Sequence, residues 1–379
     1  MGREVFSRSS YSEAKRDFGI TRDHGVTARA EQQAMKTGKL LESVDPAAGG
    51  VIRRSLMRFD KNPGGDGWIV TVGVPMPIES DVDTTGSMGD NVDTSMKNLP
   101  NTYELSAEVL DGYDPQLALG IFGDVSDNFI FQRPQFEMTA KAIVGYLKDM
   151  VPERNGGDSP EDPQYGLFAA AYLTDAYINR IGLKGYHFCV SDATAHDRFT
   201  MGDLRRVFGD SALDVVNENA KKCYGNNKHF SESKIASLRI GDVVADLLKL
   251  SHAFFVQVEE TPYVNAFWKE IYGDDRVIVI DSTDYLPQTQ AAIVGLTEGT
   301  LTLSETADWL VQHRVERFEA LRLADQLARI PLGAQALLRD KLERPLPKAG
   351  DIFQQKTDLW PISDDRTTTI TQSGGVEWL

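Results

Sequence analysis

The stretch ESDVDTTGSMGDN, residues 79–91, carries short side chains that end in oxygen at alternate positions, namely Asp83, Thr85 and Ser87. When such a stretch leaves the carboxyl end of a parallel strand, these side chains converge on the sheet edge where α/β proteins bind ligands. Carboxylates and hydroxyls, without His or Cys, suit a hard cation such as Mg²⁺ or Ca²⁺ rather than Zn²⁺. Gly86 allows the tight backbone that such a loop needs. The sequence therefore predicts a divalent-metal site within this stretch.

Apolar, β-branched segments alternate with amphipathic segments on both sides of this stretch. Strands are predicted at 68–74, 117–123, 128–132, 185–192, 253–259 and 276–282. Helices are predicted in part of 91–113 and at 139–150, 160–181, 201–208, 232–250 and 262–273. The alternation predicts an α/β fold with a Rossmann-like, doubly wound, mostly parallel sheet and helices on both faces. Because Pro75 and Pro77 interrupt the run before the loop, we expect the strand to bend or restart before Asp81.

The two ends of the chain differ from this central part. The N-terminal residues are polar and mixed, with one short helix predicted at 27–43. After residue 283 no further strand is predicted, and the following segments are helical until Pro345. We therefore divide the chain into an N-terminal extension, an α/β domain, a C-terminal helical segment and a polar tail, at residues 1–65, 66–283, 284–345 and 346–379.

Composition narrows the class of protein. The 379 residues carry a formal net charge of −16, which disfavours binding to nucleic-acid phosphates. No run of about 18 apolar residues predicts a membrane span, and the N-terminus lacks the apolar region of a secretory signal. The two cysteines, Cys189 and Cys223, make no disulfide framework. These features predict a cytoplasmic protein.

Three segments, in order, resemble the von Willebrand factor A (vWA) domain family. DTTGSMGD (83–90) is similar to the D-x-(S/T)-x-S signature of that family's metal-ion-dependent adhesion site, known as MIDAS. ERNGGDSPEDPQYGL (153–167) resembles the GGGDxPE loop that many intracellular members place before a helix. CVSDATAHD (189–197) resembles their strand end of the form ITDAxxH. The resemblance covers residues 68–283 and implies a vWA domain of the intracellular bacterial type.

The resemblance also implies a role for each matching residue. Ser87 and Thr85 would present hydroxyl oxygens to the metal, and Asp83 would bind it directly or through metal-bound water. Asp192 would hold another metal-bound water. Asp158 stands in the loop where many relatives have a threonine ligand. The implied metal is Mg²⁺, with Mn²⁺ or Ca²⁺ as alternatives.

This ligand set leaves one coordination position open, and in the family an acidic side chain of a partner fills it. We therefore expect a metal-dependent protein–protein interaction module rather than an enzyme. As in many bacterial relatives, the expected partner is a protein that presents Asp or Glu, such as an AAA+ ATPase or another assembly component. Nucleic acid and membrane are not expected partners. A structural or assembly subunit of a virus or particle, with the same fold, is an alternative.

A second reading of the same residues is a phosphatase. Asp81 and Asp83 also spell the D-x-D-x-T opening motif of haloacid-dehalogenase-like enzymes, in which the first Asp is a nucleophile and Mg²⁺ offsets phosphate charge. The acidic segment 123–128 then follows too soon for the motifs that must intervene. The six histidines have no zinc-ligand spacing. His196 is expected to have a structural role or to contact the metal ligands without binding the metal itself.

Overall fold

A central six-stranded sheet organises the chain. The computed structural model describes residues 8–17, 28–48, 51–154, 160–355, 370–371 and 377–378. The sheet order is β10-β9-β8-β4-β5-β6, and all neighbouring pairs are parallel except β5–β6. In chain order its strands are β4 (Pro75–Asp83), β5 (Asp114–Phe122), β6 (Phe131–Gln132), β8 (Gly185–Ser191), β9 (Ser251–Val258) and β10 (Val277–Ile280). Numbered along the chain, this is the order 3-2-1-4-5-6 of a doubly wound α/β fold. The predicted fold class is confirmed.

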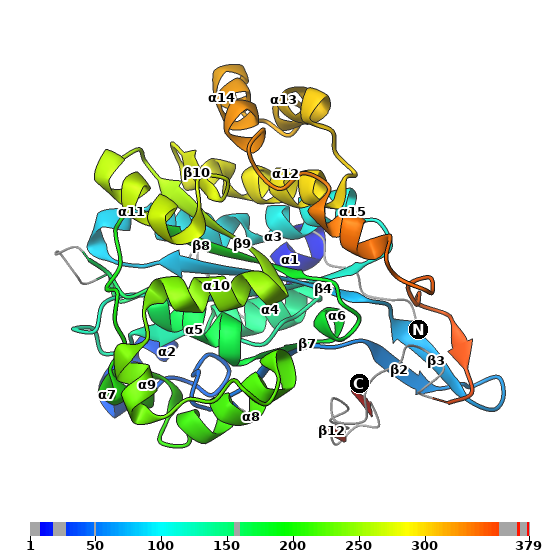
Figure 1. Cartoon of the computed structure of the whole chain (residues 1–379), viewed down its shortest axis with the longest axis horizontal. Helices are drawn as coiled ribbons and strands as arrows, with labels where there is room; N and C mark the ends of the chain where they lie inside the picture. The colour runs from blue at the N-terminus through cyan, green and yellow to red at the C-terminus, as the bar shows by residue number, and fades with distance from the viewer. Residues whose placement is uncertain are drawn as a thin grey trace.

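Helices cover both faces of this sheet (Figure 1). Successive side chains of a strand point to opposite faces of the sheet and so belong to different buried clusters. In β9, Phe254 and Val256 belong to one cluster, and Phe255 between them belongs to the other. The first cluster contains residues of α3 (Asn91–Val109), α4 (Ala140–Leu147) and α12 (Leu286–Glu298). The second contains residues of α5 (Gln164–Tyr172), α7 (Met201–Phe208), α8 (Ala212–Tyr224), α9 (Glu232–Ser237), α10 (Ile240–Leu250) and α11 (Pro262–Tyr272). Burial on both faces explains why β10 is wholly apolar and why apolar residues predominate in β8 and β9.

The strand that feeds the predicted metal loop is β4, and it lies at the centre of the sheet between β5 and β8. The apolar run at 68–74 forms β3 (Trp68–Val72) of a separate sheet, and a new strand begins at Pro75, so the expected restart before Asp81 is confirmed. Val74 accepts a backbone hydrogen bond from Asp114 of β5, which turns the backbone nitrogens of Pro75 and Pro77 away from β5. On that side β8 pairs with β4 only from Ile78 onward. The two prolines therefore cost no ladder hydrogen bond.

Smaller sheets attach the ends of the chain. β1 (Arg53–Ser55) pairs in parallel with β7 (Thr174–Ala176). An antiparallel sheet projects from the body in the order β11 (Ile352–Phe353), β3, β2 (Arg58–Lys61), β13 (Glu377–Trp378) and β12 (Ile370–Thr371) (Figure 1). The prediction that strands end at residue 283 was therefore wrong. Edge-to-face contacts of Phe59 with Trp68 and Phe353, at 5.2 and 5.5 Å between ring centroids, hold this sheet together.

The remaining helices lie at the two ends of the chain. The described N-terminal part contains α1 (Arg8–Asp17) and α2 (Ala28–Thr37), while α6 (Tyr177–Arg180) follows β7. After α12, which packs on α3, come α13 (Leu303–Gln312), α14 (Arg317–Leu327) and α15 (Ala334–Arg339). Figure 1 shows α13 and α14 standing out from the body. The division of the chain at residues 65, 283 and 345 remains a prediction.

Two predicted helices are interrupted, and one helix was missed. Residues 160–181 form α5, β7 and α6 because the chain leaves α5 at Leu173 to pair with β1. Residues 232–250 break between α9 and α10, and α8 was not predicted. Within the described ranges, no helix has the length and apolar character needed to cross a bilayer.

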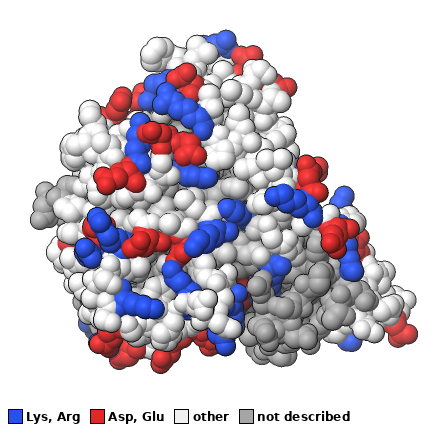
Figure 2. Space-filling view, in the orientation of Figure 1, with Lys and Arg blue, Asp and Glu red and all other residues white. Residues whose placement is uncertain are grey.

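On the face in Figure 2, Lys and Arg side chains are interspersed with Asp and Glu side chains.

Candidate metal centre

The predicted loop lies where the strand order of the sheet reverses. Asp83 ends β4, Ser191 ends the neighbouring β8, and Asp192 follows it. Ser87 lies in a short 3₁₀ helix, Gly86–Met88, directly after the β4 loop. In doubly wound sheets the crevice at this reversal point, at the carboxyl ends of the strands, is the usual place for a bound ligand.

Four of the five predicted site residues form one hydrogen-bonded chain. The backbone N–H and the hydroxyl of Thr85 donate to Asp83 Oδ1 at 2.8 and 2.7 Å. The hydroxyls of Thr85 and Ser87 lie 3.3 Å apart, and Ser87 donates to Asp192 Oδ1 at 2.9 Å. The hydroxyl of Ser191 donates to the other Asp83 oxygen at 2.6 Å. The fold therefore brings the oxygens of two loops, far apart in sequence, to a single point.

The acidic groups of this chain lie in a poorly solvated place. Asp83 is fully buried, and burial raises its pKa from 3.8 to about 6, although hydrogen bonds from Ser191 and Thr85 oppose the shift. Burial likewise raises the pKa of Asp192, against the hydrogen bond from Ser87. Both shifts have the sign expected for carboxylates that lose water without gaining a positive partner.

Asp158, the fifth predicted ligand, falls at 155–159, outside the described residues. The same GGDSPE segment places a different carboxylate at the site, that of Glu161, which the sequence reasoning missed. Glu161 is buried, and its pKa is raised to about 8 by burial first and then by the charges of Asp83 and Asp124. Two backbone hydrogen bonds of 3.0 Å each hold Glu161 against the loop that follows β8. The Glu161 N–H donates to the Thr194 carbonyl, and the His196 N–H donates to the Glu161 carbonyl. The acidic character of the motif was visible, but not which residue points inward.

The donor set fits a hard divalent cation. No basic side chain is among the charges that act on Asp83, Glu161 or Asp192 in the described part of the chain. Glu161 Oε2 is buried and has no hydrogen-bond partner there. Three carboxylates and two hydroxyls without a compensating charge match the oxygen ligands that Mg²⁺, Mn²⁺ and Ca²⁺ prefer. These residues could hold such an ion.

Asp81, the nucleophile of the phosphatase reading, is enclosed within the sheet. It is 1% exposed, and its Oδ2 lies 3.1 Å from His187 Nε2 of β8. Gly120 of β5 and Gly166 of α5 approach so closely that a Cβ at either would lie 2.0 or 2.5 Å from an Asp81 oxygen. Because no phosphate ester can reach an atom packed in this way, the geometry disfavours nucleophilic attack by Asp81.

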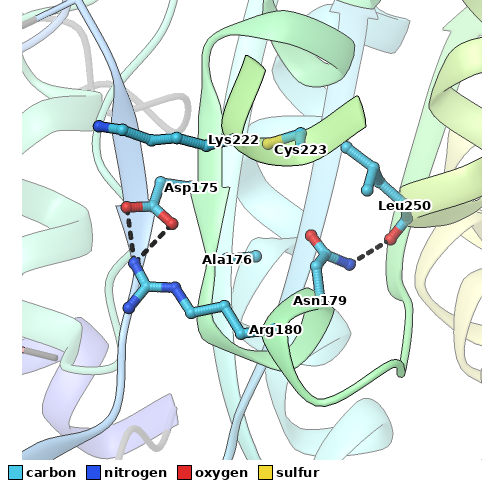
Figure 3. Close-up of a pocket in the computed structure, with 7 residues that line it drawn as sticks. All are labelled: Asp175, Ala176, Asn179, Arg180, Lys222, Cys223 and Leu250. Carbon is cyan, nitrogen blue, oxygen red and sulfur yellow. Dashed lines mark hydrogen bonds and ion pairs between the residues drawn. The ribbon is translucent and has the colours of Figure 1, made fainter. Parts of the chain in front are cut away.

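A separate small pocket lies at the opposite edge of the sheet, beside the start of β9 (Figure 3). Several of its polar groups are paired: Arg180 Nη2 donates to both oxygens of Asp175 at 2.8 Å, and Asn179 donates to the Leu250 carbonyl at 2.6 Å, whereas Arg180 Nη1 has no partner among the described residues. The cavity volume of about 40 Å³ is enough for little more than a water molecule. We assign it no ligand.

The raised pKa of Glu161 predicts a pH dependence of stability for the metal-free chain. The folded state keeps a proton on Glu161 up to about pH 8, whereas the unfolded chain loses it near 4.5. The free energy of unfolding in EDTA should therefore fall as pH rises from 6.5 to 8.5, by at most about 1.4 kcal/mol per pH unit for this proton. Glu298, whose pKa burial raises to about 7, acts in the same direction.

Urea unfolding at several pH values would measure this slope. Glu161→Gln and saturating Mg²⁺ should each reduce this slope to the part that Glu298 contributes, because a bound cation offsets the cost of keeping the Glu161 carboxylate ionised. A stability that stays level or increases between pH 6.5 and 8.5 in EDTA would contradict the expectation.

Known proteins give a distant likeness only. No protein-family model matches the sequence, and no curated protein is similar to it. Among solved structures, proximal thread matrix protein 1 from the mussel byssus is 12% identical, with a TM-score of 0.36 over 59% of this chain and 48% of that one. The pilus adhesin SpaC from Lactobacillus rhamnosus GG is 14% identical, with a TM-score of 0.37 over 64% of this chain and 34% of that one.

A third similar structure is the vWF domain of the type V pili tip protein Mfa5 from Porphyromonas gingivalis. It is 12% identical, with a TM-score of 0.38 over 61% of this chain and 97% of that domain. This chain therefore spans about half of the mussel protein and a third of the adhesin. With identities and TM-scores this low, a functional inference has to rest on the sheet order and the site residues of the chain itself.

Proposed function

We propose that this chain is a metal-dependent protein–protein interaction module of the vWA type. One observation carries the proposal: Asp83, Thr85, Ser87 and Asp192 form one oxygen network at the reversal point of the sheet, with Glu161 against it and no basic partner among the residues that the structure describes. In this proposal the hydroxyls of Thr85 and Ser87 and the carboxylate of Glu161 hold Mg²⁺, while Asp83 and Asp192 bind directly or through water. Asp158 remains a further candidate ligand.

The bound cation supplies a local positive charge with an incomplete set of ligands. The protein's part is to present that charge at an open edge and to exclude competing groups. Thr85 and Ser87 contribute neutral oxygens, so two of the cation's ligands add no negative charge and an open coordination position can take one more anionic oxygen. An Asp or Glu side chain of a partner protein provides it in a charge-assisted, directional contact. Recognition of this kind requires no reacting group, and we propose docking rather than catalysis.

The setting of the docking event follows from the resemblance of the three motifs to intracellular vWA proteins. We propose a cytoplasmic adaptor whose partner belongs to a larger assembly, such as an AAA+ ATPase.

A structural subunit is the second candidate, favoured by the exposed Phe318 and Leu321 on the projecting α14, at 75% and 50% exposure. Native mass spectrometry separates the two, because a subunit forms defined homo-oligomers and an adaptor does not.

Selection from a random peptide display library tests the docking proposal without knowledge of the partner. The immobilised chain is panned in Mg²⁺ and, in parallel, in EDTA. We expect peptides that bind only in Mg²⁺ and that lose binding when their single essential Asp or Glu is changed to Asn or Gln. Ser87→Ala should retain at most a small part of this binding, and Ser126→Ala, in the neighbouring β5–β6 loop, should retain most of it. Peptides that bind equally well in EDTA, or that need no acidic residue, would overturn the proposal.

A further inference from the structure

We propose that Asp124, Asp162 and His196 form a second cation site beside the first, suited to Mn²⁺, Co²⁺ or Zn²⁺ rather than Mg²⁺. Asp124 follows β5, Asp162 precedes α5 and His196 follows β8. One ligand atom from each of the three lies within 4.8 Å of the others, and His196 Nδ1 is 3.3 Å from Asp162 Oδ1. An imidazole beside two carboxylates shifts metal preference from Mg²⁺ toward transition metals.

The two carboxylates are held in place by the backbone around them. Asp162 Oδ2 accepts the Val125 N–H at 2.7 Å, and Asp124 Oδ1 accepts the Ser126 N–H at 2.6 Å. Arg206 of α7 donates to the carbonyls of Val125, Asp127 and Asn128, which fixes the loop that carries Asp124. Asp162 and Asp124 are only 1% and 7% exposed. The cluster is therefore a fixed feature of the fold and not a chance meeting of surface side chains.

Two unpartnered oxygens point to a missing positive charge here. Gln164 is 1% exposed and donates its amide N–H to Asp162 Oδ1, so its amide group lies at the cluster, yet its Oε1 has no partner among the described residues. Glu161 precedes Asp162, is influenced by both Asp83 and Asp124, and leaves Oε2 without a partner. Buried polar atoms seldom lack a partner. A cation held by Asp124, Asp162 and His196 would place a positive charge beside this amide group.

The simpler alternative is an ion pair between protonated His196 and Asp162. That pair would leave the Gln164 oxygen without a partner among the described residues, and it would bind no metal. The side chain of His196 is 46% exposed, so the cluster is open to solvent on that side and a cation can enter without unfolding the loop. His196 is therefore the residue at which the two explanations separate most cleanly.

Titration of the full chain with Co²⁺ in excess Mg²⁺ tests the second site. Mg²⁺ occupies the hydroxyl-rich first site, and the visible absorption of Co²⁺ then reports a ligand set that contains nitrogen. We expect one equivalent of Co²⁺ to bind to wild type, and His196→Gln to weaken this binding by at least about tenfold. His229→Gln, at an exposed histidine remote from the cluster, is the matched control and should bind as wild type. Thermal unfolding without metal checks that both variants are folded.

The outcome is independent of the docking proposal. Asp83→Asn removes the first site and should still bind one equivalent of Co²⁺, whereas failure of docking alone would leave the Co²⁺ result unchanged. The second site is disproved if wild type binds no Co²⁺ in excess Mg²⁺, or if His196→Gln binds it with unchanged affinity and spectrum.

Discussion

Asp83→Asn is expected to abolish the stabilisation of the fold by Mg²⁺ while leaving the metal-free chain no less stable than wild type at pH 8. In wild type without metal, the fully buried Asp83 is ionised above its raised pKa of about 6. The difference from the ordinary value of 3.8 corresponds to a cost of about 3 kcal/mol at that pH. Asparagine removes the charge and keeps an oxygen that can accept from the Thr85 N–H and hydroxyl.

Mg²⁺ reverses this order of stability. A ligand present at a thousand times its dissociation constant stabilises the folded state by about 4.1 kcal/mol, which exceeds the cost of ionising Asp83, and only wild type has the site to gain it. In urea unfolding, Asp83→Asn should be at least as stable as wild type in EDTA, and wild type should be the more stable of the two in Mg²⁺. Asp66→Asn, in the exposed turn between β2 and β3, is the control and should respond to Mg²⁺ as wild type does. An Asp83→Asn chain that Mg²⁺ still stabilises fully would remove Asp83 from the site.

Arg133→Met is expected to have the largest effect on stability, a loss of about 3–5 kcal/mol in the free energy of unfolding. Arg133 is 1% exposed and donates to both carboxylate oxygens of Glu79 in β4, at 2.5 and 2.7 Å. It also donates to the Ala169 and Leu173 carbonyls and to the Thr174 hydroxyl. Methionine fills similar space but leaves the Glu79 carboxylate, itself 3% exposed, without its cation.

A double variant distinguishes the lost ion pair from lost packing. Glu79→Leu combined with Arg133→Met removes both charges, and should recover much of the stability that Arg133→Met alone loses. Arg317→Met, which removes an exposed pair with Asp308 on the projecting helices, should change stability by less than about 1 kcal/mol. If the double variant were no more stable than Arg133→Met, packing rather than charge would explain the loss.

The strands that could be predicted from sequence are those whose environment is uniform. β8, β9 and β10 carry apolar residues on both faces because helices cover both faces, and each lies where it was expected. β4 escaped recognition because Glu79, Asp81 and Asp83 alternate along one of its faces. The burial of Glu79 and Asp81 depends on Arg133 and His187, which are 54 and 106 residues away from them in the chain. Periodicity within a window of residues cannot register partners so distant.

The residues of the candidate site fall into two groups: some were identified from short sequence motifs, and others depend on contacts between distant parts of the chain. Asp83, Thr85 and Ser87 lie together because two-residue spacing in one loop places them together, and this was visible in the sequence. Asp192 was identified through the resemblance of CVSDATAHD to a strand end of the vWA family. Glu161 was missed because its inward orientation depends on a backbone bridge to the loop after β8, which the spacing of the motif does not encode. The short β11 was missed since two residues carry too little periodic signal.

The composition of β4 also affects the tendency of the chain to aggregate while it is being synthesised. Because the amino-terminal part of a chain emerges first, β4 waits for β8, whose His187 lies 106 residues after Asp81. An ordinary apolar central strand, exposed for that time, would readily pair with another copy and aggregate. Pro75, Pro77 and the carboxylates along one face make β4 a poor template for such pairing. The strand at the centre of the sheet is thus protected from intermolecular association until its own neighbours are made.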